Sequence, residues 1–488
     1  MTERNPRRTR LFLLIAAAFA LALEPQTARL AAEPGRAPEI VLTADFSQTI
    51  GPIKKVNGTN LGPRLSNSRY NGHQALFNAA HFGLVRLHDA PHDNPGLRVA
   101  DTHLVFGNMN SDPSDPANYY FTSTDDYIQT ILDGGATVMY RLGTSIEHSA
   151  PHTYFVKEPE DYEKTGEIFA GIVRHYNRGW GNGFHHNIEY WEIWNEPNIG
   201  PAMWDKDFAA YCRFYAAMAK RLKREFPEIK VGGPAIAGCD QETLSQFVDY
   251  CRAENAPLDF CSWHVYTASL DEIVSSPAEV RRLLDERGFT ETELHLDEWH
   301  YFNNTWSEVQ GQSGDLESRN AYNNGDAGLN GIDAAAFDAA ALIRWQDTPL
   351  DGSCYYCTSM ATDDTWGLID DFRIPFKTYY AFRMFGEMTA EAPNRIECGA
   401  APGRFAILGG AGGGGAKRLM VVSFKEKAAS LKIRVSGVPQ SGTVAVESLD
   451  PGKKREPAVS ELTYTDGVID LGPIDGSTVK LIRFPAAN

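Results

Sequence analysis

Two short apolar stretches, each with a carboxylate near its end, limit the possible folds of this chain most strongly. Residues 190–194 are rich in aromatic and β-branched residues, as in a buried strand, and Glu196 and Pro197 follow them. Pro197 cannot donate to a sheet and pushes Glu196 out of helical geometry, so the strand should end there. A second such strand over 294–300 carries Glu298, 102 positions after Glu196. This gap holds about three strand-plus-helix units of ~30 residues. We therefore predict an α/β fold, a (β/α)8 TIM barrel with both carboxylates on its catalytic face.

The carboxylate pair indicates a chemistry. Retaining glycoside hydrolysis needs two carboxyl groups about 5–5.5 Å apart, one as acid and then base, the other as nucleophile. Glu196 and Glu298 are the candidates for this pair. Asn195 is expected to bond the 2-hydroxyl of the sugar. This chemistry requires no metal and no organic cofactor. The alternative is that each glutamate only pairs with an arginine.

Further motifs carry a resemblance to a known family. They are Val-Asn-Gly-Thr-Asn at 56–60, Asn-Glu-Pro at 195–197 and Trp-Gly-Leu at 366–368. Together they resemble glycoside hydrolase family 39, a family of clan A retaining (β/α)8-barrel glycosidases that includes β-xylosidases and α-L-iduronidases. The resemblance covers most of the chain after residue 56. It implies that Glu196, after the fourth barrel strand, is the acid/base, with a pKa that the neighbouring carboxylate raises, and that Glu298, at the end of the seventh strand, is the nucleophile.

The resemblance also implies supporting residues. Arg86, on the predicted second strand, would contact the nucleophile and keep it ionised, since an opposite charge lowers a carboxylate pKa. His88 lies two residues on and shares its face; it resembles a sugar-binding residue but could equally be a buried structural histidine. Trp366 could form a floor under the sugar. Asn60 is either a sugar ligand or a turn former.

The predicted sixth strand, residues 258–266, ends in two more candidates. His264 and Tyr266 share one face of that strand. Residues at these places in the clan bond the nucleophile and the sugar, and a Tyr266 hydroxyl bonded to Glu298 would help to keep it ionised. Just past the third strand, Glu147 and His148 are weaker candidates.

The chain divides into four predicted regions. Residues 1–32 have a basic start, a 13-residue apolar core at 11–23 and small residues after it, which predicts a signal peptide cleaved between about 22 and 35 and a secreted or periplasmic protein. A membrane anchor is the alternative. Residues 33–52 should form a strand that joins the carboxy-terminal module, 53–393 the barrel, and 394–488, where the pattern changes to period two, a β-sandwich that supports the barrel by packing.

Charge and cysteines exclude some functions. With 63 acidic and 46 basic residues the net charge is −17, which argues against nucleic acid and anionic membranes as partners. The charge does not identify the carbohydrate substrate, since neutral and charged glycans both remain possible. The oligomeric state cannot be read from the sequence. Among seven cysteines at least one is unpaired, and Cys239–Cys251 or Cys354–Cys398 are possible disulfides in an exported protein. Cys354 and Cys357 should face opposite sides of a strand, which disfavours a metal site.

Three alternatives stay open. The first is another clan A family, such as an endo-acting glucanase or mannanase, with the same catalytic roles. The second is a non-catalytic carbohydrate-binding barrel, against which both carboxylates argue. The third is a metal-dependent barrel hydrolase, which would need a ligand cluster such as His-x-His. The sugar is also open, because family xylosidases usually carry a tryptophan where this chain has Tyr356 or Cys357.

Overall fold

The structure is a computed structural model. It describes residues 37–63, 73–88, 99–144, 156–303, 325–358, 366–370 and 373–485. The predicted signal peptide, the candidates Glu147 and His148, and most of the loop after the seventh barrel strand lie outside these ranges.

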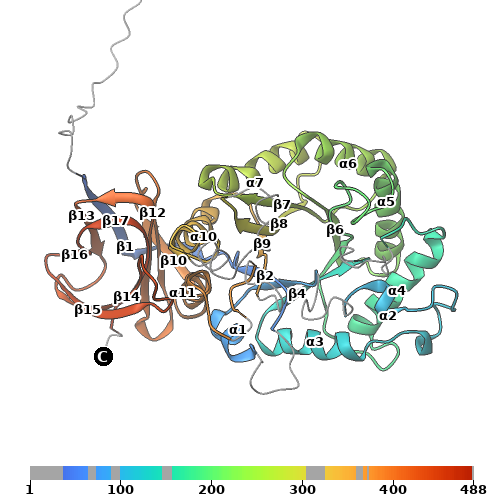
Figure 1. Ribbon diagram of the computed structural model, residues 1–488, viewed down its shortest axis with the longest axis horizontal. Coiled ribbons are helices and arrows are strands. Elements are labelled where there is room, and N and C mark those ends of the chain that lie inside the picture. Colours follow the sequence, from blue (N-terminus) through green and yellow to red (C-terminus); the bar gives the residue numbers. More distant parts are fainter. Residues whose placement is uncertain are drawn as a thin grey trace, which may run out of the picture. The chain divides into compact units, whose positions relative to one another are not determined.

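Eight parallel strands close into a barrel in the order β2 to β9, with helices around them (Figure 1). The strands are β2 (Gly58–Asn60), β3 (Leu84–Arg86), β4 (Thr137–Leu142), β5 (Tyr190–Ile193), β6 (Lys230–Ile236), β7 (Phe260–Thr267), β8 (Glu293–Tyr301) and β9 (Gly352–Tyr355). The predicted (β/α)8 fold is confirmed. Three helix-and-strand units separate β5 from β8, as the spacing of the two carboxylates predicts.

The helices bury apolar faces, and several begin at a side chain that caps the first turn. They are α1 (Gln74–Ala80), α2 (Thr102–Val105), α3 (Thr122–Asp133), α4 (Tyr162–Arg178), α5 (Phe208–Glu225), α6 (Gln241–Glu254), α7 (Leu270–Asp285), α10 (Ile332–Arg344) and α11 (Lys377–Glu391). Asp161, Asp207 and Asp240 precede α4, α5 and α6, and each carboxylate accepts a backbone N–H of the first turn. Such caps fix where each helix starts, and therefore the length of the loop from the strand before it.

The second module is a nine-stranded sheet in the order β15-β14-β17-β12-β11-β10-β1-β13-β16. Its strands are β1 (Glu39–Pro52), β10 (Asn394–Cys398), β11 (Phe405–Ala411), β12 (Lys417–Ala428), β13 (Ser430–Ser436), β14 (Gly442–Leu449), β15 (Ala458–Tyr464), β16 (Val468–Asp470) and β17 (Ile474–Arg483). All pairs are antiparallel except β1 with β13. The strands form one continuous hydrogen-bonded sheet, and their apolar side chains gather in one cluster. The amino-terminal strand β1 is thus an internal strand of a sheet built mainly by the carboxy-terminal hundred residues.

Helix α11 joins the barrel to this sheet through ion pairs. Glu387 accepts hydrogen bonds from Arg418 of β12 and Arg483 of β17. Arg383 pairs with Glu447 of β14. The sheet is therefore attached to the barrel by part-buried charges as well as by apolar packing.

The cysteines carry no disulfide. All seven are free thiols, so the pairs Cys239–Cys251 and Cys354–Cys398 are wrong. Spacing along the chain cannot show that two thiols lie on different elements or point apart. Within the described ranges, no helix combines the length and the apolar character that a membrane crossing requires.

Candidate active site

The end of β5 turns sharply and presents Glu196. The strand stops at Ile193, and both Trp194 (φ 75°) and Glu196 (φ 45°) adopt the left-handed backbone region, which non-glycine residues rarely enter. The Glu196 amide donates to the carbonyl oxygen of Ala235 at 2.8 Å. Ala235 is itself left-handed (φ 51°) and lies where the pairing of β6 with β7 shifts by one residue. The turn predicted from Pro197 thus exists, and a bulge in the next strand anchors it.

A second bulge presents Glu298. Trp263 pairs with Leu296 and His264 with Glu298, so Asp297 is an extra residue in β8. Strict alternation would put Asp297 and Glu298 on opposite faces, whereas a bulge allows two successive side chains to point inward. Both carboxyl groups lie within ion-pair distance of Arg86.

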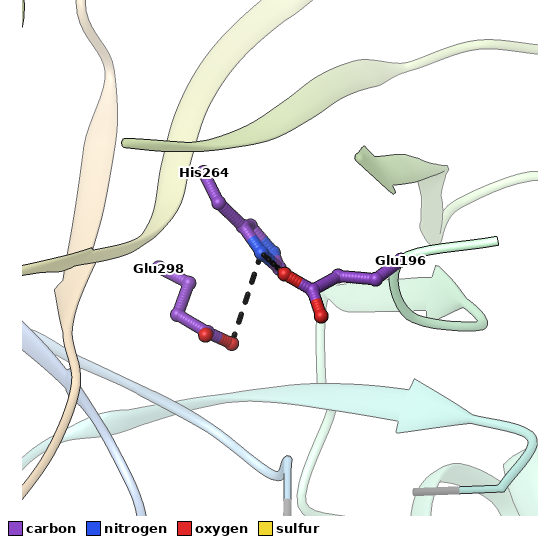
Figure 2. Close-up of side chains that lie close together, drawn as sticks. All are labelled: Glu196, His264 and Glu298. Carbon is purple, nitrogen blue, oxygen red and sulfur yellow. Dashed lines mark hydrogen bonds and ion pairs between the residues drawn. The ribbon is translucent and has the colours of Figure 1, made fainter. Parts of the chain in front are cut away.

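Glu196 and Glu298 lie on either side of His264 (Figure 2). His264 Nδ1 is 2.9 Å from Glu196 Oε1 and 3.9 Å from Glu298 Oε2. One oxygen of Glu196 and one of Glu298 lie within 4.8 Å of each other. This separation is close to the ~5–5.5 Å of retaining glycosidases and well below the ~6.5–9.5 Å of inverting ones.

The same three side chains could also approach one metal ion. Among the described residues they form the one group of three His, Cys, Asp or Glu side chains with that property. Imidazole and carboxylate ligands would suit zinc. However, the Arg86 guanidinium lies 3.2 Å from Glu298 Oε2 and would repel a cation there. The arrangement therefore fits carboxylate chemistry better than metal binding.

Glu298 has a hydrogen-bond donor on each oxygen. Tyr266 donates its hydroxyl to Oε1 at 2.6 Å, and Arg86 donates Nη1 to Oε2 at 3.2 Å. His88 Nε2 is 4.0 Å from Oε2. Burial nevertheless raises the pKa of Glu298 above its ordinary value, and the charge of Glu196 adds to this, while Arg86 and Tyr266 oppose it. The predicted partners are present, but the predicted low pKa is wrong, because burial outweighs them.

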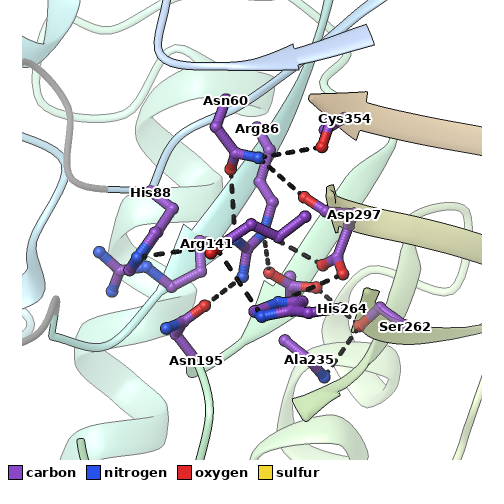
Figure 3. A network of polar contacts seen from close by, with 12 residues as sticks. Asn60, Arg86, His88, Arg141, Asn195, Ala235, Ser262, His264, Asp297 and Cys354 are labelled. Atoms are coloured by element: carbon purple, nitrogen blue, oxygen red, sulfur yellow. Dashed lines mark hydrogen bonds and ion pairs between the residues drawn. The ribbon is translucent and has the colours of Figure 1, made fainter. Parts of the chain in front are cut away.

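Arg86 is the fully buried centre of the polar network under the site (Figure 3). Its guanidinium donates hydrogen bonds to four side chains, which are Glu192 (2.6 Å), Asn195 (2.7 Å), Asn60 (3.2 Å) and Glu298 (3.2 Å). Burial opposes its charge, but the surrounding carboxylates outweigh burial and raise its pKa. Arg86 is therefore positively charged and holds the ends of β2, β5 and β8 together.

The sequence prediction missed Glu192 and Asp297, which form a buried carboxyl pair beside Arg86. Burial opposes ionisation of Glu192, but Arg86, Asp297 and Ser262 together lower its pKa. Burial and the charge of Glu192 raise the pKa of Asp297 well above its usual range. Asp297 is therefore the protonated member of the pair. The alternation of side chains along β5 could have indicated that Glu192 faces the barrel interior. Asp297 could not have been found in this way, because its inward position depends on the bulge in β8.

Three predicted residues have more specific positions than the sequence could give. Asn60 is neither a turn former nor exposed to a ligand: it is buried, accepts from Arg86 and donates to the Asp297 carbonyl oxygen at 2.9 Å. Asn195 accepts from Arg86 through Oδ1, so this atom is already used. Burial lowers the pKa of His264 to about 4, so the ring is neutral near pH 7 and bonds Glu196.

Four aromatic side chains, here called the aromatic wall, pack together around Trp366, and one of them, Tyr266, bonds Glu298. They are Tyr266, Phe302, Tyr356 and Trp366. The half-buried Trp366 is central: its ring centroid lies 5.7 Å from Tyr266, 6.0 Å from Tyr356 and 6.2 Å from Phe302. The predicted sugar floor, Trp366, is therefore next to the tyrosine that bonds Glu298.

Comparisons with known proteins give one family model and two β-xylosidases as relatives. A sequence model of the glycosyl hydrolases of family 39 matches residues 84–317. A β-xylosidase of Geobacillus stearothermophilus is 26% identical over 293 residues, which cover 54% of this chain and 51% of that protein. A β-xylosidase of Caldicellulosiruptor saccharolyticus is 24% identical over 305 residues, covering 57% of this chain and 58% of that protein. The chain thus spans little more than half the length of these curated relatives.

Solved structures share the fold over nearly the whole chain. A glucosidase from Croceicoccus marinus has a TM-score of 0.74 at 22% identity, and covers 92% of this chain and 100% of its own. A monomeric β-xylosidase from Caulobacter crescentus has a TM-score of 0.66 at 18% identity, with the same coverage. Both likenesses extend beyond the barrel, since the barrel alone is too short to account for nine-tenths of the chain.

Proposed function

We propose that this chain is a glycosidase of glycosyl hydrolase family 39 and that it cleaves O-glycosidic bonds with retention of configuration. One observation carries this proposal: Glu196 and Glu298 approach within 4.8 Å at the carboxyl ends of β5 and β8. A water molecule between the carboxylates, as inversion requires, would need a wider gap.

In the first step, an ionised Glu298 oxygen attacks the anomeric carbon of the sugar. The bond to the leaving oxygen breaks, and Glu196 gives that oxygen its proton, which leaves a covalent glycosyl-enzyme and an ionised Glu196. Before the attack, the negative charge of Glu298 is stabilised by hydrogen bonds from Arg86 at 3.2 Å and from Tyr266 at 2.6 Å. These donors hold the nucleophile in one orientation before attack.

In the second step, Glu196 takes a proton from water, whose oxygen attacks the anomeric carbon and releases Glu298. Two displacements at one carbon restore its original configuration. Neutral His264 keeps a hydrogen bond to Glu196 in either protonation state, because each ring nitrogen can donate or accept according to tautomer. His264 is therefore a positioning residue for the acid/base group.

We propose a β-xyloside or a related β-glycoside as substrate. Two relatives are β-xylosidases, and a glucosidase is among the proteins of similar structure. The aromatic wall would stack on the apolar face of the sugar. Tyr356, where family xylosidases usually carry tryptophan, makes glucosides and arabinosides necessary members of a substrate panel.

A rescue experiment tests the catalytic roles. Wild type, Glu298→Ala and the control Glu291→Ala would be assayed on aryl glycosides, each with and without azide. We expect Glu298→Ala to lose activity and, with azide, to release the glycosyl azide of inverted configuration. Glu291 is an exposed carboxylate seven residues earlier, and its variant should match wild type. Undiminished hydrolysis by Glu298→Ala would contradict the proposal.

We also propose that the protein is exported, as the amino-terminal sequence predicts. The basic start followed by a 13-residue apolar core supports this proposal. Amino-terminal sequencing of protein from the culture medium or periplasm should give a mature chain that begins between about 22 and 35. A chain that keeps its first residues in the cytoplasm would contradict export.

A further inference from the structure

The loop between β14 and β15, residues 450–457, connects the nine-stranded sheet to the chain that follows barrel strand β9. Arg455 of this loop places Nη1 2.9 Å from Asp370 Oδ2. Its guanidinium carbon also lies 4.5 Å from the ring centroid of Phe376. The Arg455 side chain is 27% exposed and that of Asp370 only 7%. The pair is thus mostly shielded, which strengthens an ion pair and a cation–π contact relative to the open surface.

The barrel fixes the loop that carries Arg455. Lys377 Nζ donates to the carbonyl oxygens of Asp450 and Gly452, both at 2.7 Å. The Gly452 amide donates to Asp326 Oδ1 at 2.8 Å. Arg455 therefore extends from a backbone held on two sides, and little ordering entropy remains to oppose its contacts.

Hydrogen bonds join residues 366–370 to residues 373–376, and these two segments are here called the turn. Asp370 lies in the first of them. Its amide donates to the Ile374 carbonyl oxygen at 3.1 Å, and its carboxylate accepts the Ile374 amide at 2.8 Å. The Phe376 amide donates to the Leu368 carbonyl oxygen at 2.9 Å. Arg455 holds this turn at Asp370, on one strand, and at Phe376, on the other.

Trp366 begins this turn and is part of the aromatic wall. Its ring is 5.7 Å from that of Tyr266, whose hydroxyl bonds Glu298 at 2.6 Å. A continuous series of contacts thus runs from Arg455 through Asp370 and the turn to Trp366. The last member faces the site, and the first lies in the accessory sheet.

We propose that Arg455 is a positioning residue of the sugar-binding site: through Asp370 and Phe376 it fixes the turn so that Trp366 stays against Tyr266. This inference rests on the proposed function, because it assigns Trp366 to sugar binding. Arg455 does not contact the reacting atoms, so its loss should weaken sugar binding and leave the chemical step nearly unchanged. The accessory sheet would then contribute to substrate affinity as well as to stability.

The chain offers a matched control in Arg383. It also lies between the barrel and the sheet, pairs with a carboxylate, Glu447, and places its guanidinium carbon 5.7 Å from an aromatic ring, that of Tyr380. Its side chain is 22% exposed. Arg383→Ala and Arg455→Ala therefore remove similar interactions, but only Arg455→Ala removes contacts with the turn.

The test compares wild type, Arg455→Ala, Arg455→Lys and Arg383→Ala in steady-state kinetics and amide hydrogen exchange. For Arg455→Ala we expect a roughly five- to tenfold rise in KM, with kcat within about twofold of wild type. The rise follows because the variant loses one shielded ion pair and one cation–π contact. Arg455→Lys should restore part of the affinity, because it keeps the charge but lacks the flat guanidinium face. Arg383→Ala should leave KM unchanged.

Hydrogen exchange gives a result that does not depend on activity. The Leu368, Ile369 and Phe376 amides are bonded within the turn or to Cys357 and Thr358, and Arg455→Ala should speed their exchange while Arg383→Ala should not. Unchanged exchange, or equal changes in KM for both alanine variants, would overturn the inference. A wild type that hydrolyses no glycoside would overturn the proposed function, and with it this role of Arg455.

Discussion

Replacing Tyr266 by phenylalanine should move the acidic limb of the pH–rate profile to higher pH. The Tyr266 hydroxyl donates to Glu298 Oε1 at 2.6 Å and so stabilises the ionised carboxylate. Without this bond the ionised form is less favoured, and the pKa of Glu298, already raised by burial, rises further. Because the nucleophile must be ionised, kcat/KM at acidic pH should fall first.

The size of the shift follows from the bond that is removed. A hydrogen bond to a charged group contributes about 1.5–3 kcal/mol, and about 1.4 kcal/mol corresponds to one pKa unit. These figures give about one to two units. Arg86 still bonds the other oxygen, and the Glu298 side chain is 8% exposed, so water can replace part of the lost bond. We therefore expect a shift near one unit.

The assay is kcat/KM on an aryl glycoside from pH 4 to 8, which reports groups of the free enzyme. Tyr379→Phe is the control, because it removes a tyrosine hydroxyl that bonds the Leu76 carbonyl oxygen and leaves the site unchanged. Its profile should match wild type. An active Tyr266→Phe variant whose acidic limb stays in place, or moves to lower pH, would refute the reasoning.

Two further predictions concern buried carboxyl groups. Asp338 of α10 is fully buried, neither carboxyl oxygen has a hydrogen-bond partner among the described residues, and burial raises its pKa well above the ordinary value. The folded state must therefore keep Asp338 protonated while the unfolded state ionises it, so stability is lost as pH rises above about 4. Asp338→Asn removes this loss, and its gain in Tm over wild type should grow from pH 4 to pH 7; a gain that is constant or shrinks would contradict this. In the second pair, Glu192→Gln takes a buried anion from Arg86 and should cost about 3–5 kcal/mol, whereas Asp297→Asn replaces one neutral group by another and should cost far less. Denaturant unfolding of both variants measures this asymmetry, and equal losses would contradict the assigned protonation.

The sequence was sufficient to predict contacts that follow from strand ends. Parallel strands in a barrel bring their carboxyl ends to one face, so Glu196 and Glu298 could be grouped from their positions, and the family resemblance added Arg86 and Tyr266. The structure brings all four together. Period two also places His264 and Tyr266 on the same side of β7.

Features that depend on irregular backbone could not be predicted. The direction of a strand side chain is predicted from strict alternation, and the bulge at Asp297 breaks that alternation. Likewise, Ala235 accepts the hydrogen bond of the Glu196 amide only because the pairing of β6 shifts by one residue there. The partners of Glu298 predicted a lowered pKa, whereas burial raises it. The neighbouring residues in the sequence do not show how deeply a side chain is buried. The contact of Arg455 with Asp370 joins residues 85 positions apart on two modules, and no local pattern marks it.

The stereochemistry of the first-formed product tests the central claim most directly. Wild-type enzyme would hydrolyse an aryl β-glycoside in the NMR tube, and the anomeric proton signals would be followed before mutarotation mixes them. With Glu298 as nucleophile and Glu196 as acid/base, the β-anomer of the free sugar should appear first and the α-anomer only later. The α-anomer appearing first would show a single displacement by water and would contradict the assigned roles of both carboxylates.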